Sequence, residues 1–185
     1  KVTEAAHPVP DDMGEVGVQQ ILDLLNTLKS EDQVICLFSG GGSALMALPA
    51  NGVSMEDKKD INKQLLASGA TIHEMNCVRR HLSKIKGGGL LRYCGNAKVS
   101  TYLVSDVTGD DPSVIASGPT LPDNTTCKDA LEVIDRFKIQ VSDKIRQKLI
   151  SGELETLKPG SPIFERTSEP VILASSSDML KAAEW

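Results

Sequence analysis

Residues 34–43 read VICLFSGGGS, and this stretch decides the fold. Its first five residues form a short, continuously apolar run, which is typical of a strand buried on both faces of a parallel sheet. Ser39 and three successive glycines follow the run, and apolar residues resume at Ala44. A strand, a glycine-rich loop and a helix in this order indicate an α/β protein.

The rest of the chain alternates between helical and strand patterns. Apolar residues recur at helical spacing from Val18 to Leu28 and predict a helix before the first strand. Further strands are expected at residues 99–105 and 171–174. Further helices are expected at residues 54–66, 71–85, 128–137, 142–150 and 178–185. This alternation predicts one α/β domain with a three-layer, mainly parallel sheet that carries helices on both faces.

Local signals mark where several of these helices begin and end. Ser54 with Asp57, and Thr71 with Glu74, have the spacing of capping boxes. Gly69 suits the left-handed residue that ends a helix, and Thr126 suits an N-cap. These signals place helix boundaries independently of the apolar pattern.

Charge and composition restrict the class of ligand. The net charge is -5 and the sequence pI is about 5.2, which argues against nucleic-acid and membrane-surface partners. No apolar run approaches the roughly 20 residues that span a bilayer. The four cysteines are widely separated and form no zinc-binding spacing. We therefore expect a small-molecule ligand and a cytoplasmic protein, with the mitochondrion left open.

The glycine loop has two interpretations. Backbone N–H groups of successive glycines can approach a phosphate at the start of a helix. The alternative is a tight turn that only packs the strand against the helix. The loop lacks the third glycine of the dinucleotide fingerprint, and the P-loop pattern G-x-x-x-x-G-K-[ST] occurs nowhere in the chain.

Positive charge gathers in one part of this acidic protein. Arg79, Arg80, His81, Lys84 and Lys86 precede a second run of glycines. Such a cluster indicates an anion site. The alternative is a solvated helix face whose cations complement the negative end of the helix dipole.

Asp106 comes directly after the predicted strand at residues 99–105. A carboxylate at this position can hold a metal ion or accept a hydroxyl proton. The alternative is a helix or turn cap. Asp110 and Asp111 fit a turn before a proline better than a metal site. His7 and His73 have no ligand partner in the sequence, so a structural or surface role is expected for them.

Five segments together resemble the class II glycerate kinase family. They are HPVPD (7–11), LFSGGGSAL (37–45), SGATI (68–72), NCVRRHLSKIK (76–86) and SDVTGDDPSVIASGPTLPD (105–123). The resemblance implies a Rossmann-like first domain and a smaller second domain of the MOFRL type. It also implies transfer of a phosphoryl group from ATP to the 2-hydroxyl of D-glycerate, giving 2-phosphoglycerate and ADP, with Mg²⁺ as cofactor.

The resemblance also implies a set of site residues. Arg79 and Lys86 are expected to meet the glycerate carboxylate or the developing phosphate charge, and Asp106 to serve as base or Mg²⁺ ligand. His81 and Ser117 are further candidates. The residues expected to bind the nucleotide phosphates are Gly40, Gly41, Gly42 and Ser43.

Residues 1–185 are expected to form part of the first, Rossmann-like kinase domain, without the second domain. The early lysine of the family is also missing, so this chain alone is expected to be inactive. Two other functions stay open: an NAD(P)-dependent hydroxypyruvate reductase and a non-catalytic nucleotide-binding module. A homodimer is a further expectation.

Overall fold

One layer of the protein is a parallel three-stranded sheet. The computed structural model describes residues 2–7, 9–107 and 109–183. The strand order is β1 (Gln33–Phe38), β2 (Lys98–Val104) and β3 (Val171–Ala174). β1 and β2 pair in parallel from Gln33 with Lys98 to Phe38 with Leu103. The predicted parallel α/β architecture is confirmed.

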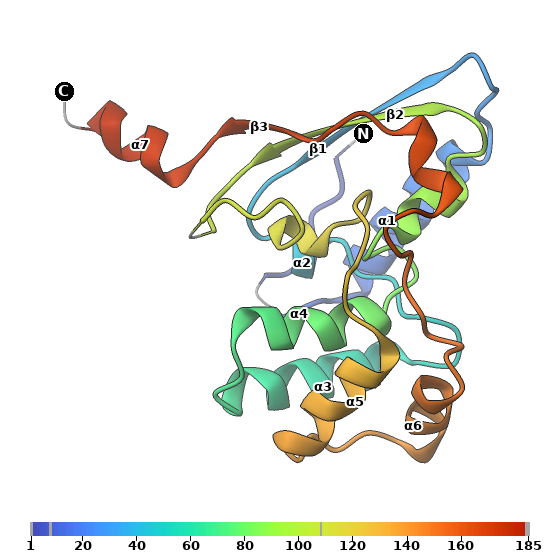
Figure 1. Cartoon of the computed structure of the whole chain (residues 1–185), viewed down its shortest axis with the longest axis vertical. Coiled ribbons are helices and arrows are strands. Elements are labelled where there is room, and N and C mark those ends of the chain that lie inside the picture. The colour runs from blue at the N-terminus through green and yellow to red at the C-terminus, as the bar shows by residue number, and fades with distance from the viewer. Residues whose placement is uncertain (1, 8, 108, 184–185) are drawn as a thin grey trace.

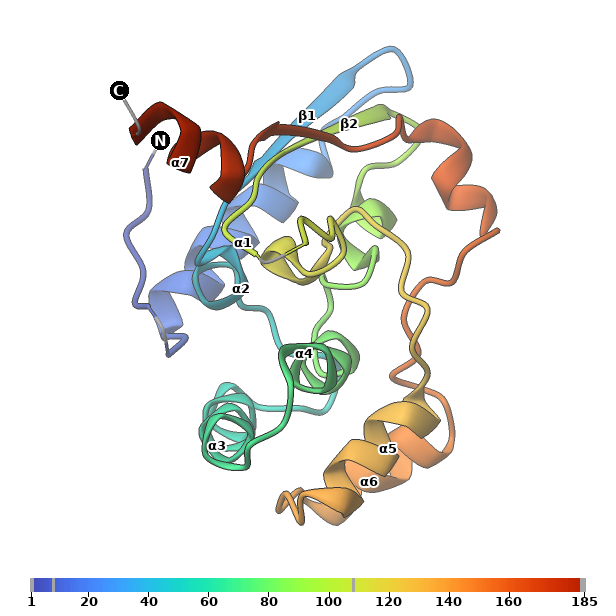
Figure 2. The ribbon, with the colours of Figure 1, turned by 60° about the vertical axis from the view of Figure 1, so that its left-hand side comes forward.

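One face of the sheet carries the first of two hydrophobic cores. α1 (Asp12–Leu25) and the 3-10 helices η1 (Gly89–Tyr93) and η2 (Ile115–Ser117) contribute to it. Figure 2 shows α1 running beneath the strands. Buried residues of this core are Val18, Leu22, Cys36, Phe38, Leu90, Leu91, Val99, Leu103 and Ile115.

The opposite face of the sheet is bare, which corrects one expectation. Ile35 is 62% exposed, Leu37 is 72% exposed and Leu173 is 60% exposed. The apolar run at residues 34–38 predicted burial on both faces and helices on both sides. Within the part of the chain that the structure describes, only one side is covered. The alternation of buried Cys36 and Phe38 with exposed neighbours shows this directly.

Four helices form a second layer below the sheet, as Figure 1 shows. They are α3 (Met55–Ala67), α4 (Ile72–His81), α5 (Cys127–Arg136) and α6 (Asp143–Ile150). Their apolar faces enclose the second core, whose largest fully buried members are Leu65, Val78, Leu82, Ile134, Ile145 and Leu149. The two layers are joined where α4 contacts η2.

The predicted caps are confirmed. Ser54, Thr71 and Thr126 are N-caps, and each forms a complete capping box with the acidic residue three positions later. Gly69 adopts the left-handed conformation, with φ of 79°, after the end of α3. α1 runs from residue 12 to residue 25, earlier than the predicted residues 18–28.

Other boundaries differ from the prediction. The helix expected at 71–85 ends at His81, because Ser83 forms an antiparallel bridge with Pro49. α2 (Gly42–Leu45) is a single turn after the glycine loop. η3 (Pro162–Arg166) precedes β3, and α7 (Ser176–Ala183) begins before the predicted residue 178. Its predicted end at residues 184–185 lies outside the described part.

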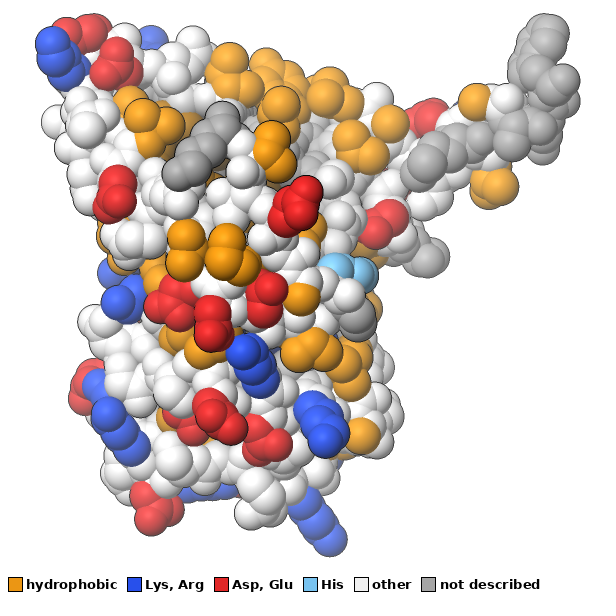
Figure 3. All heavy atoms as spheres, turned by 180° about the vertical axis from the view of Figure 1, so that it is seen from behind, with side chains coloured by type: hydrophobic (Ala, Val, Ile, Leu, Met, Phe, Trp, Pro, Cys, Tyr) orange, Lys and Arg blue, Asp and Glu red, His pale blue; other side chains and the backbone are white. Residues whose placement is uncertain are grey.

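The surface agrees with a modest net charge. Figure 3 shows acidic and basic side chains interspersed on one face, without a broad area of positive charge. Among the described residues, no helix combines the length and apolar composition needed to cross a bilayer.

Candidate functional site

The carboxyl ends of β1 and β2 bring the glycine loop and Asp106 together. The two strands are parallel neighbours, so the segments that follow them leave the sheet at the same edge. An ideal Cβ built on Gly40 would lie 1.9 Å from Oδ2 of Asp106. Gly40 therefore allows the exposed carboxylate of Asp106 to rest directly against the loop.

The loop itself needs glycine at a second position. Gly41 has φ of 80°, in the left-handed region that favours glycine, and caps the single turn of α2. A Cβ on Gly41 would also lie 3.3 Å from Cδ2 of His7. Within the described residues, the N–H groups of Gly40 and Gly41 donate to no acceptor. They are therefore available to an anionic ligand.

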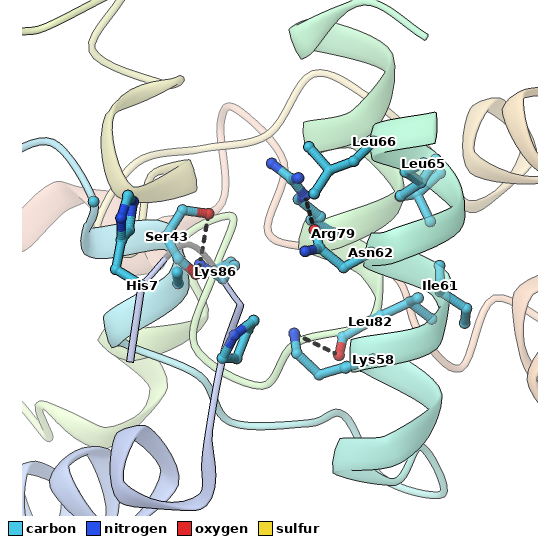
Figure 4. A pocket seen from close by; sticks show the side chains of 14 residues that line it. His7, Ser43, Lys58, Ile61, Asn62, Leu65, Leu66, Arg79, Leu82 and Lys86 are labelled. Atoms are coloured by element: carbon cyan, nitrogen blue, oxygen red, sulfur yellow. Dashed lines mark hydrogen bonds between the residues drawn. The ribbon is translucent and has the colours of Figure 1, made fainter. Parts of the chain in front are cut away.

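A cavity of about 240 Å³ opens beside this loop and is lined by three cationic side chains, Lys58, Arg79 and Lys86. Figure 4 shows Ser43 and Lys86 on one side of it, facing Arg79 and Lys58 on the other. The remaining lining residues are His7, Pro10, Gly41, Ala44, Ile61, Asn62, Leu65, Leu66, Val78 and Leu82. No acidic residue is among those that line it, so the cavity favours an anion.

Lys86 is the most deeply placed of these cations, with 3% of its surface exposed. Its Nζ donates to the carbonyl oxygen of Ser43 at 2.7 Å, to Oγ of Ser43 at 3.1 Å and to the carbonyl oxygen of Ala116 at 3.4 Å. Burial, and then the positive charges of Lys58 and the two arginines, lower the pKa of Lys86 well below its usual range. A bound anion would reverse this shift.

A strained turn fixes the position of Ser117. Ala116, Ser117 and Gly118 all have left-handed backbones, with φ of 51°, 61° and 60°. Ser117 is fully buried, and its Oγ lies 2.8 Å from Oγ of Ser43. It also donates to Oδ1 of Asn76 at 3.3 Å. Such strain concentrates at functional sites, and here it orders polar groups around the glycine loop.

The adjacent arginines of α4 point to different surroundings. Arg79 lines the cavity, and its Nε donates to Oδ1 of Asn62 at 2.8 Å. Burial lowers the pKa of Arg79. Arg80 instead lies 3.3 Å from Oδ2 of Asp123 in an ion pair whose two side chains are buried. Only the first arginine is available to a ligand in the cavity.

His81 lies away from the cationic cavity. It is 1% exposed, with Nδ1 2.8 Å from the carbonyl oxygen of Cys77 and Nε2 3.1 Å from Oε1 of Glu155. Burial raises the pKa of Glu155, but several hydrogen bonds outweigh it and hold this pKa at about 2. The donors are the N–H of Cys127 and the side chains of Lys158 and His81. These contacts tie α4 to the segment after α6.

Lys58 was not expected in the site. It is only 8% exposed, and its Nζ contacts the carbonyl oxygen of Leu82 at 3.5 Å. Burial, with a contribution from Arg79, lowers the pKa of Lys58 to about 8. Lys58 lies three residues before Ile61 and seven before Leu65, on the buried face of α3, but a lysine within a charged run gives no sign of this burial in the sequence.

The structure thus brings most of the expected site residues together. Gly41, Ser43, Arg79 and Lys86 line the cavity. Gly42 lies against Ala116, whose Cβ would be 3.0 Å from a Cβ on Gly42. The remaining two, Gly40 and Asp106, lie at the edge of the sheet beside the same loop and outside the cavity lining.

Comparison with known proteins identifies the family. Residues 1–150 match the family model described as "Domain of unknown function (DUF4147)". The chain belongs to this family. A glycerate 2-kinase of Pyrococcus horikoshii is 44% identical over 168 residues, which cover 88% of this chain and 38% of that protein. A protein of Agrobacterium vitis, provisionally named a hydroxypyruvate reductase, is 46% identical over 99% of this chain and 41% of its own length.

A solved structure agrees with these relatives. The crystal structure of glycerate kinase from Thermotoga maritima superposes with a TM-score of 0.85 at 39% sequence identity. The superposed region covers 97% of this chain and 42% of the Thermotoga maritima chain. The chain therefore spans about two fifths of the length of the relatives that it matches. The resemblance to class II glycerate kinases that the motifs indicated is confirmed.

Proposed function

We propose that this chain belongs to an ATP-dependent glycerate 2-kinase, which transfers a phosphoryl group to the 2-hydroxyl of D-glycerate. The observation that carries the proposal is the cavity beside the glycine loop, which is lined by three cationic side chains and by no acidic residue. Phosphoryl transfer depends chiefly on positioning and on neutralising negative charge. Relatives named glycerate 2-kinase support the same reaction.

In this proposal, residues 1–185 are part of a Rossmann-like first domain of a longer protein. A second, MOFRL-type domain would complete the enzyme, which fits the greater length of the relatives. The bare face of the sheet, with Ile35, Leu37 and Leu173 exposed, is also consistent with further covering structure. The isolated chain is then expected to have little or no activity.

The glycine loop would bind the phosphates of ATP. The N–H groups of Gly40 and Gly41 are available to phosphate oxygens, and the absence of a Cβ allows close approach. Gly42 and Ser43 continue the loop, and the hydroxyl of Ser43 already accepts a hydrogen bond from Lys86. Lys86 and Arg79 would neutralise the glycerate carboxylate and the phosphate charge that develops during transfer.

Asp106 would have one of two roles, as general base for the 2-hydroxyl or as ligand of Mg²⁺. The residues present fit a magnesium ion, because Mg²⁺ is often held by one or two carboxylates together with substrate phosphates. The carboxylate of Asp106 is exposed and rests against the loop expected to hold those phosphates. When bound, Mg²⁺ would supply additional charge neutralisation. Asp106 itself would hold the acceptor hydroxyl or take its proton.

The test is a direct assay of the full-length protein. ADP release is followed in the presence of ATP, Mg²⁺ and D-glycerate, and 2-phosphoglycerate is identified as the product. A parallel assay follows NADH oxidation with hydroxypyruvate, because a relative carries the reductase name. Reduction of hydroxypyruvate without ATP turnover would reject the kinase and favour the reductase. Binding of ATP without turnover of any acceptor would favour a non-catalytic nucleotide-binding module.

A further inference from the structure

We propose that Lys58 is a further substrate-binding residue and that it binds the carboxylate of D-glycerate together with Arg79. The inference rests on the proposed function and adds a residue to its acceptor site. It starts from the placement of Lys58 on the cavity-facing side of α3, where only 8% of its surface is exposed.

The buried ammonium of Lys58 has more donors than acceptors within the described residues. An ammonium group has three N–H donors, and burying it is costly unless they are paired. Within the described residues, its contact is a long one, 3.5 Å to the carbonyl oxygen of Leu82. No carboxylate among these residues forms an ion pair with Lys58. Figure 4 shows its side chain reaching into the cavity, where a ligand oxygen would satisfy the remaining donors.

The position of Lys58 separates it from the nucleotide loop. Figure 4 places Lys58 and Arg79 on the wall opposite Ser43 and Lys86. The cavity is about 240 Å³, which is below the roughly 300 to 1,000 Å³ of pockets for drug-sized ligands. A three-carbon hydroxy acid fits this volume better than a nucleotide. Its carboxylate would meet the Lys58 wall while its hydroxyl faces the loop.

All ionisable groups that line the cavity are basic. Lys58 comes from α3, Arg79 from α4, Lys86 from the segment after α4 and His7 from the segment before α1. The lysine charges disfavour one another in the empty cavity, where burial and Arg79 bring the pKa of Lys58 to about 8. A bound carboxylate stabilises the ammonium and raises this pKa. Glycerate binding should therefore take up protons and weaken above about pH 8.

The experiment compares Lys58→Met with Lys59→Met in the full-length protein. Lys59 is the adjacent lysine, more exposed and paired with Asp12 at 3.2 Å on the surface. Isothermal titration with D-glycerate, without ATP, measures affinity at pH 7.0 and 8.5 in two buffers of different ionisation enthalpy, which also gives proton uptake. Steady-state kinetics then give KM for D-glycerate and for ATP.

The expected result is selective. Lys58→Met weakens D-glycerate binding about 10- to 100-fold, the range for a hydrogen bond to a charged group. KM for D-glycerate rises with it, KM for ATP stays unchanged, and proton uptake at pH 8.5 decreases. Lys59→Met behaves like the wild type.

Several outcomes would overturn the assignment. If Lys58→Met folds and binds D-glycerate as tightly as the wild type, Lys58 is not part of the acceptor site. The kinase proposal still stands in that case, provided that the wild-type protein phosphorylates D-glycerate. A rise in KM for ATP alone would move Lys58 to the nucleotide. If Lys58→Met does not fold, glycerate binding to the wild type without proton uptake at pH 8.5 rejects the inference. Failure of the wild type to bind or phosphorylate D-glycerate rejects the proposed function itself.

Discussion

Replacement of Gly40 by alanine should displace the carboxylate of Asp106, although Asp106 itself is unchanged. A Cβ at residue 40 would lie 1.9 Å from Oδ2 and 2.4 Å from Cγ of Asp106, and real Cβ atoms essentially never approach other heavy atoms below 3.0 Å. The carboxylate must therefore leave its place. Gly40 is not among the residues with positive φ, so alanine adds no left-handed strain.

The expected magnitude follows from this displacement. Moving the carboxylate out of contact shifts it by about 1 Å or more, and a misplacement of this size costs on the order of 10²-fold in rate. Loss of general-base catalysis through Asp106→Ala should cost about 10²- to 10⁴-fold. Stability should change little or rise, because a glycine-to-alanine change in an ordinary conformation restricts the unfolded chain, an effect worth roughly 0.4 to 1 kcal/mol.

A double-mutant cycle in the full-length protein tests this reasoning. kcat and the melting temperature are measured for Gly40→Ala, Asp106→Ala and the double mutant. With the carboxylate removed, alanine at residue 40 meets no clash and should lower kcat little further. Gly17→Ala is the control, since Gly17 also lacks a positive φ and its Cβ would come no closer than 3.3 Å to the side chain of Thr3. Equal losses of kcat from Gly40→Ala in both backgrounds, or a wild-type kcat in the single mutant, would refute the coupling.

Three further outcomes are expected. Gly41→Val should abolish ATP binding in calorimetry while the circular dichroism spectrum is retained, because φ is 80° and the added Cβ approaches His7; unchanged ATP affinity would contradict the loop assignment. Asp123→Asn should destabilise the protein by about 3 to 5 kcal/mol in urea unfolding, because Arg80 is left buried and unpaired; a loss below about 1 kcal/mol would contradict the ion pair. The pKa of Glu155 is lowered from 4.5 to about 2, so its stabilising contribution is complete above pH 4.5 and is lost as pH falls toward 2. The melting temperature, measured from pH 2 to 6, should fall with this loss of stability, and the fall should be smaller in Glu155→Gln. An equal fall in the variant would reject the role of Glu155.

Local signals predicted helix starts better than helix ends. Ser54, Thr71 and Thr126 begin helices because each capping box lies within four residues and needs no distant partner. The end of α4 depends on distant residues. Lys84 N–H donates to the carbonyl oxygen of Leu48, and this contact replaces a further helical turn. No pattern within residues 71–85 contains that information.

The same difference limits prediction of the site. The glycine loop, Arg79 and Lys86 were selected through the resemblance to class II glycerate kinases, because local chemistry left both the loop and the cation cluster with two interpretations. Lys58 stands in a charged run that is typical of a solvated helix face, and its burial depends on how α3 packs against α4. The cation cluster alone did not separate Arg79 from Arg80. The family resemblance selected Arg79, and the structure places the two arginines in different surroundings.

The strained turn explains how the separate parts of the site keep one arrangement. Left-handed backbones at Ala116 and Ser117 cost roughly 1 to 2 kcal/mol per residue, so the contacts that they permit must offset this cost. Those contacts form one directed chain of hydrogen bonds. Lys86 donates to Ser43, the Ser43 hydroxyl donates to Ser117, and Ser117 donates to Asn76. Since Asn76 can only accept through Oδ1, every donor direction in the chain is fixed. Nζ of Lys86 is thereby held against the glycine loop even without a ligand, and this preorganised position is what electrostatic stabilisation of phosphoryl transfer requires.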